Sequence, residues 1–153
     1  MITILAIDTI KEQCIKSLIE TFQQRLTNKL YIKILELKSE KKYYEQNYNL
    51  AKDIETQRLI DQVPDNSYLV TLDEQGVLMN SMALSSLIYQ TLNHQHLTFI
   101  LGGTYGLTEK AIKKAQLVLA LSKMTLTHEF ARLFLMEQLY RAYTINNHIK
   151  YHH

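Results

Sequence analysis

The chain has 153 residues, with 17 Lys and Arg against 15 Asp and Glu and a formal net charge of +2 at pH 7. This length predicts one domain, residues 1–153. So small a positive excess excludes binding to nucleic acid through overall charge and leaves local basic clusters for that role. Cys14 is the only cysteine, which excludes an intrachain disulfide framework and favours a reducing compartment. No apolar run is long enough to span a membrane, so we expect a cytoplasmic protein.

The first half of the chain alternates between β-branched apolar runs and segments with helical spacing. These patterns predict strands at 1–7, 30–37 and 67–72, and helices at about 10–26 and 50–62. Asp8 and Thr9 are expected to cap the first helix. The polar segment 38–49 is typical of a mobile loop, or of a surface whose lysines bind phosphate and whose tyrosines stack on bases. The third strand is expected to end at residues 73–76.

The second half centres on two apolar strands that each end in a polar turn. After a helix at 81–93, we predict strands at 97–101 and 117–121, a short helix between them and a long apolar helix from about 128. This order predicts an α/β fold with a largely parallel sheet and helices on both faces. Because ligands bind at the carboxyl ends of such strands, Gly103 and Leu121 are expected to border one pocket.

Several familiar chemistries are excluded by missing motifs. The chain has no GxxxxGK[ST], no GxGxxG after its first strand and no GxSxG. His94 and His96 have suitable spacing for a metal, but no cysteine or carboxylate cluster completes a ligand set, so no metal site is expected. The glycine turn at 102–106 taken alone is equally typical of a plain strand-to-helix connection.

Six longer sequence segments, spread over the whole chain, resemble those of a known family. They are ITILAI at 2–7, VTLDEQG at 70–76, ILGGTYGL at 100–107, LALSKMTLTHEFAR at 119–132, EQLYRAY at 137–143, and Tyr151-His152. In order and spacing they resemble the RlmH family of the SPOUT class, methyltransferases of large-subunit ribosomal RNA. The resemblance implies a SPOUT-type α/β knot with a C-terminal trefoil knot, and a homodimer without metal or membrane.

The resemblance also implies an activity and a site. The activity is S-adenosylmethionine-dependent methylation of N3 of a pseudouridine in the 23S ribosomal RNA of the ribosome. His152 is then the expected catalytic base, and Tyr151 positions the target base or stacks on it. RNA contacts are expected from His128, Arg132 and Arg141. The expected cofactor-binding residues are Leu72, Gly103, Leu121, Ser122, Lys123, Met124, Thr125 and Leu126.

Five positions depart from the family pattern. Thr127 stands where proline is usual, and Glu129 adds a negative charge beside His128. Thr104-Tyr105 occupies the glycine turn, and His153, native or derived from a tag, stands where Lys or Arg commonly closes the chain. These departures motivate an alternative, a weakly active or inactive paralogue that binds S-adenosylmethionine and RNA. Element order alone also allows a flavodoxin-like nucleotide-binding domain.

Overall fold

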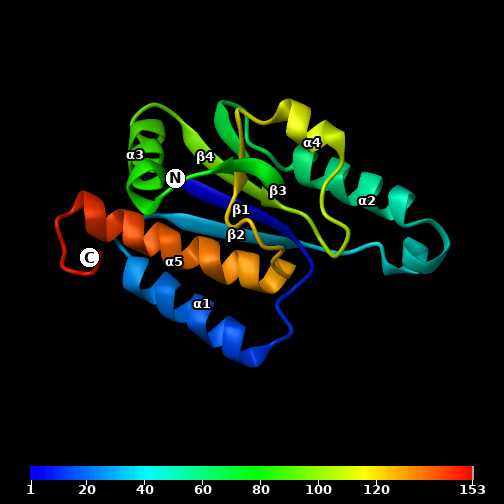
Figure 1. Ribbon diagram of the computed structural model, residues 1–153, viewed down its shortest axis with the longest axis horizontal. Helices are drawn as coiled ribbons and strands as arrows, with labels where there is room; N and C mark the ends of the chain where they lie inside the picture. Colours follow the sequence, from blue (N-terminus) through cyan, green and yellow to red (C-terminus); the bar gives the residue numbers. More distant parts are fainter. Residues whose placement is uncertain (153) are drawn as a thin grey trace.

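A computed structural model describes residues 1–152, and His153 lies outside the described residues. One parallel sheet of five strands forms the centre, in the order β2-β1-β4-β3-β5 (Figure 1). Its strands are β1 (Ile2–Ile7), β2 (Ile32–Leu37), β3 (Ser67–Leu78), β4 (His96–Leu101) and β5 (Leu117–Ala120). The helices are α1 (Gln13–Leu26), α2 (Tyr44–Asp61), α3 (Ser81–Leu92), α4 (Glu109–Lys114) and α5 (His128–Asn146), with a 3-10 turn η1 at Lys41–Tyr43.

The helices form two layers because alternate residues of each strand face opposite sides of the sheet. In β1, Ile4 and Ala6 pack with α1, α3 and α5, whereas Leu5 and Ile7 pack with α2 and α4. All six residues of β1 are therefore buried, as parallel strands covered on both faces require. Figure 1 shows α5 crossing in front of the sheet beside α1. The expected parallel α/β architecture is confirmed, while the trefoil knot stays a prediction.

The loop predicted at 38–49 was wrong in its second half. The chain forms η1 and then enters α2 at Tyr44, with a non-helical backbone at Asn47 (φ −157°, ψ 78°). This kink breaks the helical periodicity, which explains why the pattern only became recognisable from Leu50 onward. The predicted cap at Asp8 and Thr9 was also wrong, because α1 begins only at Gln13 and its N-cap residue is Glu12.

Strand β3 continues through the segment where a turn was expected, and its pairing with β5 shifts register between Leu72 and Val77. Leu72 and Val77 both pair with Leu119, so residues 73–76 bulge out of the ladder. Gly76 allows this close return to β5. A Cβ at Gly76 would lie 2.7 Å from backbone atoms of the neighbouring strand.

Replacing Gly76 with alanine is therefore expected to lower the free energy of unfolding by at least about 1–3 kcal/mol, because backbone atoms must move to admit the methyl group. Urea denaturation followed by far-ultraviolet circular dichroism measures the effect. Gln75→Ala, at an exposed neighbouring position, is the matched control and should differ from wild type by less than about 0.5 kcal/mol. Equal stability of Gly76→Ala and wild type would contradict the close contact.

Among the helices of residues 1–152, none combines the length and the apolar character that crossing a bilayer demands.

Candidate functional site

A cavity of about 890 Å³ lies where the bulge of β3 and the carboxyl ends of β4 and β5 meet the start of α5. The three strands reach the cavity at one level, because Leu72, the last residue of β3 before its bulge, is in register with Leu101 of β4 and Leu119 of β5. Most of the residues expected to bind a cofactor come together in its wall. They are Leu72, Gly103, Leu121, Ser122, Met124, Thr125 and Leu126. Lys123 lies outside the lining and is exposed.

The glycine turn forms one wall of the cavity and is held by its own backbone. The amide of Gly106 donates to the carbonyl of Gly103 at 3.1 Å, and the two residues form an isolated antiparallel bridge. Gly106 has a φ of +75°, a conformation that side chains with a Cβ rarely adopt. Gly106 is therefore the residue of this turn at which a glycine is required.

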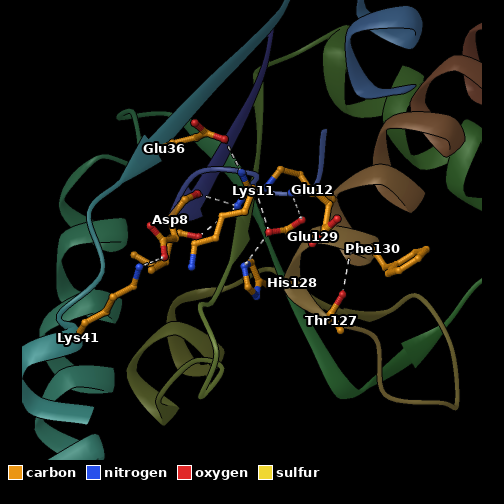
Figure 2. A network of polar contacts seen from close by, with 11 residues as sticks. Asp8, Lys11, Glu12, Glu36, Lys41, Thr127, His128, Glu129 and Phe130 are labelled. Carbon is orange, nitrogen blue, oxygen red and sulfur yellow. Dashed lines mark hydrogen bonds and ion pairs between the residues drawn. The ribbon is translucent and has the colours of Figure 1, made fainter. Parts of the chain in front are cut away.

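The bend 122–127 forms another part of the wall and is held by polar contacts. Ser122 Oγ accepts from the amide of Met124 at 2.9 Å, and the Thr125 hydroxyl donates to Glu74 at 2.8 Å. Thr127 then caps α5, since its Oγ1 accepts from the amide of Phe130 at 3.3 Å (Figure 2). Thr127, which stands where the resemblance led us to expect proline, therefore serves as the N-cap of α5.

Glu129 fastens the start of α5 to the start of α1. Its carboxylate accepts from the amides of Lys11 and Glu12 at 3.0 and 3.2 Å, and it lies 3.9 Å from Nε2 of His128 (Figure 2). Burial opposes the negative charge, but the two amides, His128 and Arg132 outweigh it and lower the pKa of Glu129. His128 in turn lines the cavity. The negative charge of Glu129, one of the departures from the family pattern, therefore joins α5 to the segment that precedes α1.

Replacing Glu129 with glutamine is expected to destabilise the protein by about 1–3 kcal/mol at neutral pH, because two amides lose a charged acceptor. Since the folded-state pKa of Glu129 is lowered, its charge stabilises the fold above the unfolded pKa. That contribution is lost as the pH falls through the folded pKa. The wild type should therefore lose more stability than Glu129→Gln between neutral and acid pH. Urea titrations at several pH values measure this, with exposed Glu20→Gln as control; parallel curves would contradict it.

Arg132, expected to contact RNA, is instead 1% exposed. Its guanidinium donates to Glu36 at 2.5 Å and to the carbonyls of Ile7 and Asp8 at 3.1 and 3.0 Å. Burial lowers the pKa of Arg132 against the opposing influence of Glu36. The side chain connects α5 to the ends of β1 and β2 beside the cavity, which favours a supporting role over a direct phosphate contact.

Tyr151 and His152 pack against the C-terminal half of α5. The phenol of Tyr151 donates to Glu137 at 3.1 Å, and Nδ1 of His152 lies 3.3 Å from Nη1 of Arg141. Burial and the Glu137 carboxylate raise the pKa of Tyr151. His128 and Arg141 are thirteen positions apart on one helix, which corresponds to roughly 20 Å. In a single chain the tail is therefore remote from the cavity, at the opposite end of α5 (Figure 1).

The cavity also has contributors that sequence reasoning missed. Lys52 and Tyr105 line it, and Lys52 comes from α2, which lies on the far layer of the sheet from α5. No local pattern marks Lys52, because its position depends on how α2 packs. Tyr105 could have been recognised from the sequence, because it is a large side chain within the glycine turn. Within residues 1–152, no group of three or more His, Cys, Asp or Glu side chains is placed to hold a metal ion.

Comparison with known proteins gives consistent matches over the whole chain. The family described as predicted SPOUT methyltransferase matches residues 1–152. Ribosomal RNA large subunit methyltransferase H of Clostridium botulinum (strain Eklund 17B / Type B) is 35% identical over 156 residues, covering 99% of this chain and 98% of that protein. The protein of the same name from Halothermothrix orenii is 36% identical over 156 residues, with 99% and 98% covered.

A third relative with this name, from Syntrophotalea carbinolica, is 38% identical over 133 residues, covering 86% of this chain and 85% of that protein. Among solved structures, a probable methylase family protein from Haemophilus influenzae Rd KW20 has the same fold. It aligns with a TM-score of 0.60 and 17% identity, covering 99% of this chain and 70% of that chain.

Proposed function

Because the chain belongs to the SPOUT methyltransferase family and is a ribosomal RNA methyltransferase, we propose that it methylates N3 of a pseudouridine in 23S ribosomal RNA. The methyl donor in this proposal is S-adenosylmethionine. The observation that carries it is the cavity, which gathers seven of the eight residues expected at the donor. Its volume of about 890 Å³ falls within the range of small-molecule sites.

The wall of the cavity suits a donor with an apolar methionine chain and a polar nucleoside. Leu72, Leu121 and Leu126 provide apolar surface, and the bend 122–127 and the glycine turn provide backbone amides and carbonyls. When bound, S-adenosylmethionine supplies a methyl group already activated by its sulfonium charge. The protein then needs no nucleophilic side chain, and alignment of N3 with the methyl group can contribute roughly 7–11 kcal/mol.

The remaining requirement is removal of the proton from N3. A neutral histidine beside the target base can accept it, which is the role we assign to His152. Tyr151 holds the base against His152 in this scheme. Both side chains already have partners on α5, so the tail is ordered and presents its groups from a fixed surface. Arg141 and His128 remain our candidates for RNA contact.

A homodimer resolves the distance between tail and cavity. Two copies of α5 related by a two-fold axis perpendicular to the helix would pack antiparallel and would place the tail of one chain at the cavity of the other. Exposed apolar side chains support such a face: Phe130 and Phe134 are 55% and 41% exposed and lie one turn apart on α5. Met82 of the adjoining α3 is 52% exposed.

Recognition of the substrate is assigned to the ribosome surface, not to free RNA. The net charge of +2 provides little attraction to an RNA backbone, so a shaped target is the better match. The C-terminal trefoil knot and the cytoplasmic location, where ribosomes assemble, complete the proposal.

The proposal is tested with ribosomes from cells that lack the modification. Protein and tritiated S-adenosylmethionine should give incorporation into 23S RNA, and nuclease digestion should place the label in an N3-methylated pseudouridine. Ribosomes that already carry the modification are the control and should accept no label. Donor binding by calorimetry together with no incorporation would instead support the inactive paralogue. The structural uses of Thr127 and Glu129 make that second candidate the weaker one.

A further inference from the structure

An aromatic cluster borders the cavity on the side of α2. Tyr105 of the glycine turn stacks on Tyr48 with ring centroids 5.2 Å apart and an interplanar angle of 27°. Tyr44 meets Tyr105 edge-on at 4.9 Å and 82°. Tyr105 and Tyr48 are 39% and 49% exposed. The cluster therefore combines a stacked pair with ring surface that remains open to solvent.

Tyr44 anchors the cluster to the protein interior. Its hydroxyl donates to Glu55 at 2.8 Å, and the same carboxylate oxygen accepts from the amide of Glu40 at 2.7 Å. Burial and Glu55 raise the pKa of the Tyr44 phenol to about 12. Glu55 is 1% exposed and lies directly beneath Gly103. The position of the stacked pair is thus fixed relative to the cavity.

Positive charge adjoins the pair. Lys52 follows Tyr48 by one turn of α2 and lines the cavity. The neighbouring lysines are engaged, Lys110 with Asp53 and Lys41 with Asp8. No carboxylate within residues 1–152 forms an ion pair with Lys52. An unengaged ammonium beside exposed aromatic rings is the combination that binds unpaired nucleotides, through phosphate contact and stacking.

We propose that Tyr48 and Tyr105 form a stacking platform for an unpaired base that flanks the target nucleotide in ribosomal RNA, with Lys52 contacting the adjoining phosphate. This inference rests on the proposed function, since it assigns a second contact to the same substrate. An RNA base fits better than the donor's adenine because Tyr48 lies outside the cavity lining, on the exposed rim. For segment 38–49 the sequence allowed either a mobile loop or a surface whose tyrosines stack on bases. The platform corresponds to the second, through Tyr48.

The test is the binding of unmodified ribosomes by co-sedimentation, which does not depend on turnover. Tyr48→Ala and Tyr105→Ala should each weaken binding by about 5- to 100-fold, the range for loss of one base stack. Tyr48→Phe and Tyr105→Phe keep the ring and should stay within about twofold of wild type. Tyr31→Ala, which removes a 69% exposed tyrosine outside the cluster, is the matched control. Calorimetry should show unchanged binding of S-adenosylmethionine in the Tyr48 variants and in Tyr31→Ala, whose side chains lie outside the cavity lining.

Each contrary result has a distinct meaning. Ribosome binding equal to wild type in both alanine variants overturns the platform, and so does weaker donor binding by Tyr48→Ala, which would assign the stacked rings to the adenine. A wild type that binds ribosomes but transfers no methyl group overturns the proposed function and leaves the platform to be decided by the same binding data. A folded wild type that fails to bind ribosomes overturns both.

Discussion

Mixing two inactive variants is expected to restore methyl transfer to about a quarter of the wild-type rate, because half of the dimers formed would be mixed and each would carry one intact site. One variant, Ser122→Trp, places a bulky side chain at the cavity wall. The other combines Tyr151→Ala with His152→Ala and removes the tail groups. The mixed dimer joins the intact cavity of one chain to the intact tail of the other.

Each variant alone should lose most activity, for different reasons. Loss of the proposed base should lower kcat by about 100- to 10,000-fold while leaving donor binding intact. Ser122→Trp should abolish donor binding measured by calorimetry. The mixture is prepared by mild denaturation and refolding, and tritium transfer to unmodified ribosomes is the measurement.

The controls show whether activity comes from mixed dimers or from refolding itself. Each variant refolded alone should stay inactive, and refolded wild type should recover its full rate. If the tail served the cavity of its own chain, the mixed dimer would contain no intact site. A refolded mixture that contains mixed dimers and shows no activity would therefore exclude completion by the partner.

The second large effect is expected at Arg132, and it concerns stability. Arg132→Met should lower the free energy of unfolding by about 3–5 kcal/mol, because it leaves Glu36 and two backbone carbonyls without their buried donor. Urea denaturation monitored by circular dichroism measures the loss. Arg141→Met, which removes a half-buried arginine from the same helix, is the matched control and should cost less.

Arg132→Met also distinguishes a structural role of Arg132 from a direct contact with RNA. A side chain that only contacts phosphate would leave the unfolding curve unchanged and would reduce the salt dependence of ribosome binding by about one unit of slope. Arg132→Met with wild-type stability would contradict the buried network. We expect the reverse pattern, with reduced stability and an unchanged salt slope for the folded fraction.

The strand plan was predictable because parallel strands covered on both faces leave a simple pattern. Continuous apolar runs such as ITILAI at 2–7 are fully buried, and turn residues mark where they end. The meeting of Gly103 and Leu121 at one cavity followed from the same rule, since parallel strands bring their carboxyl ends to one edge. Assigning a donor to that edge required the family resemblance.

Other features depend on contacts that no local pattern carries. Glu129 accepts from the amides of Lys11 and Glu12, 118 and 117 positions away, and Arg132 donates to the carbonyl of Ile7, 125 positions away. The kink at Asn47 concealed the beginning of α2. Tyr44 and Tyr48 contact Tyr105 only because α2 packs beside the glycine turn. Each is a product of tertiary packing.

The link from Glu129 to the amides of Lys11 and Glu12 has a consequence for how such proteins diverge. A lineage that replaces this glutamate must supply another acceptor for these two amides, most simply Asp or Asn at position 9, whose side chain can accept from amides two and three residues on. Paired changes at these two sites are therefore the expected evolutionary trace. Replacing Glu129 alone in this chain should cost stability that the second change returns.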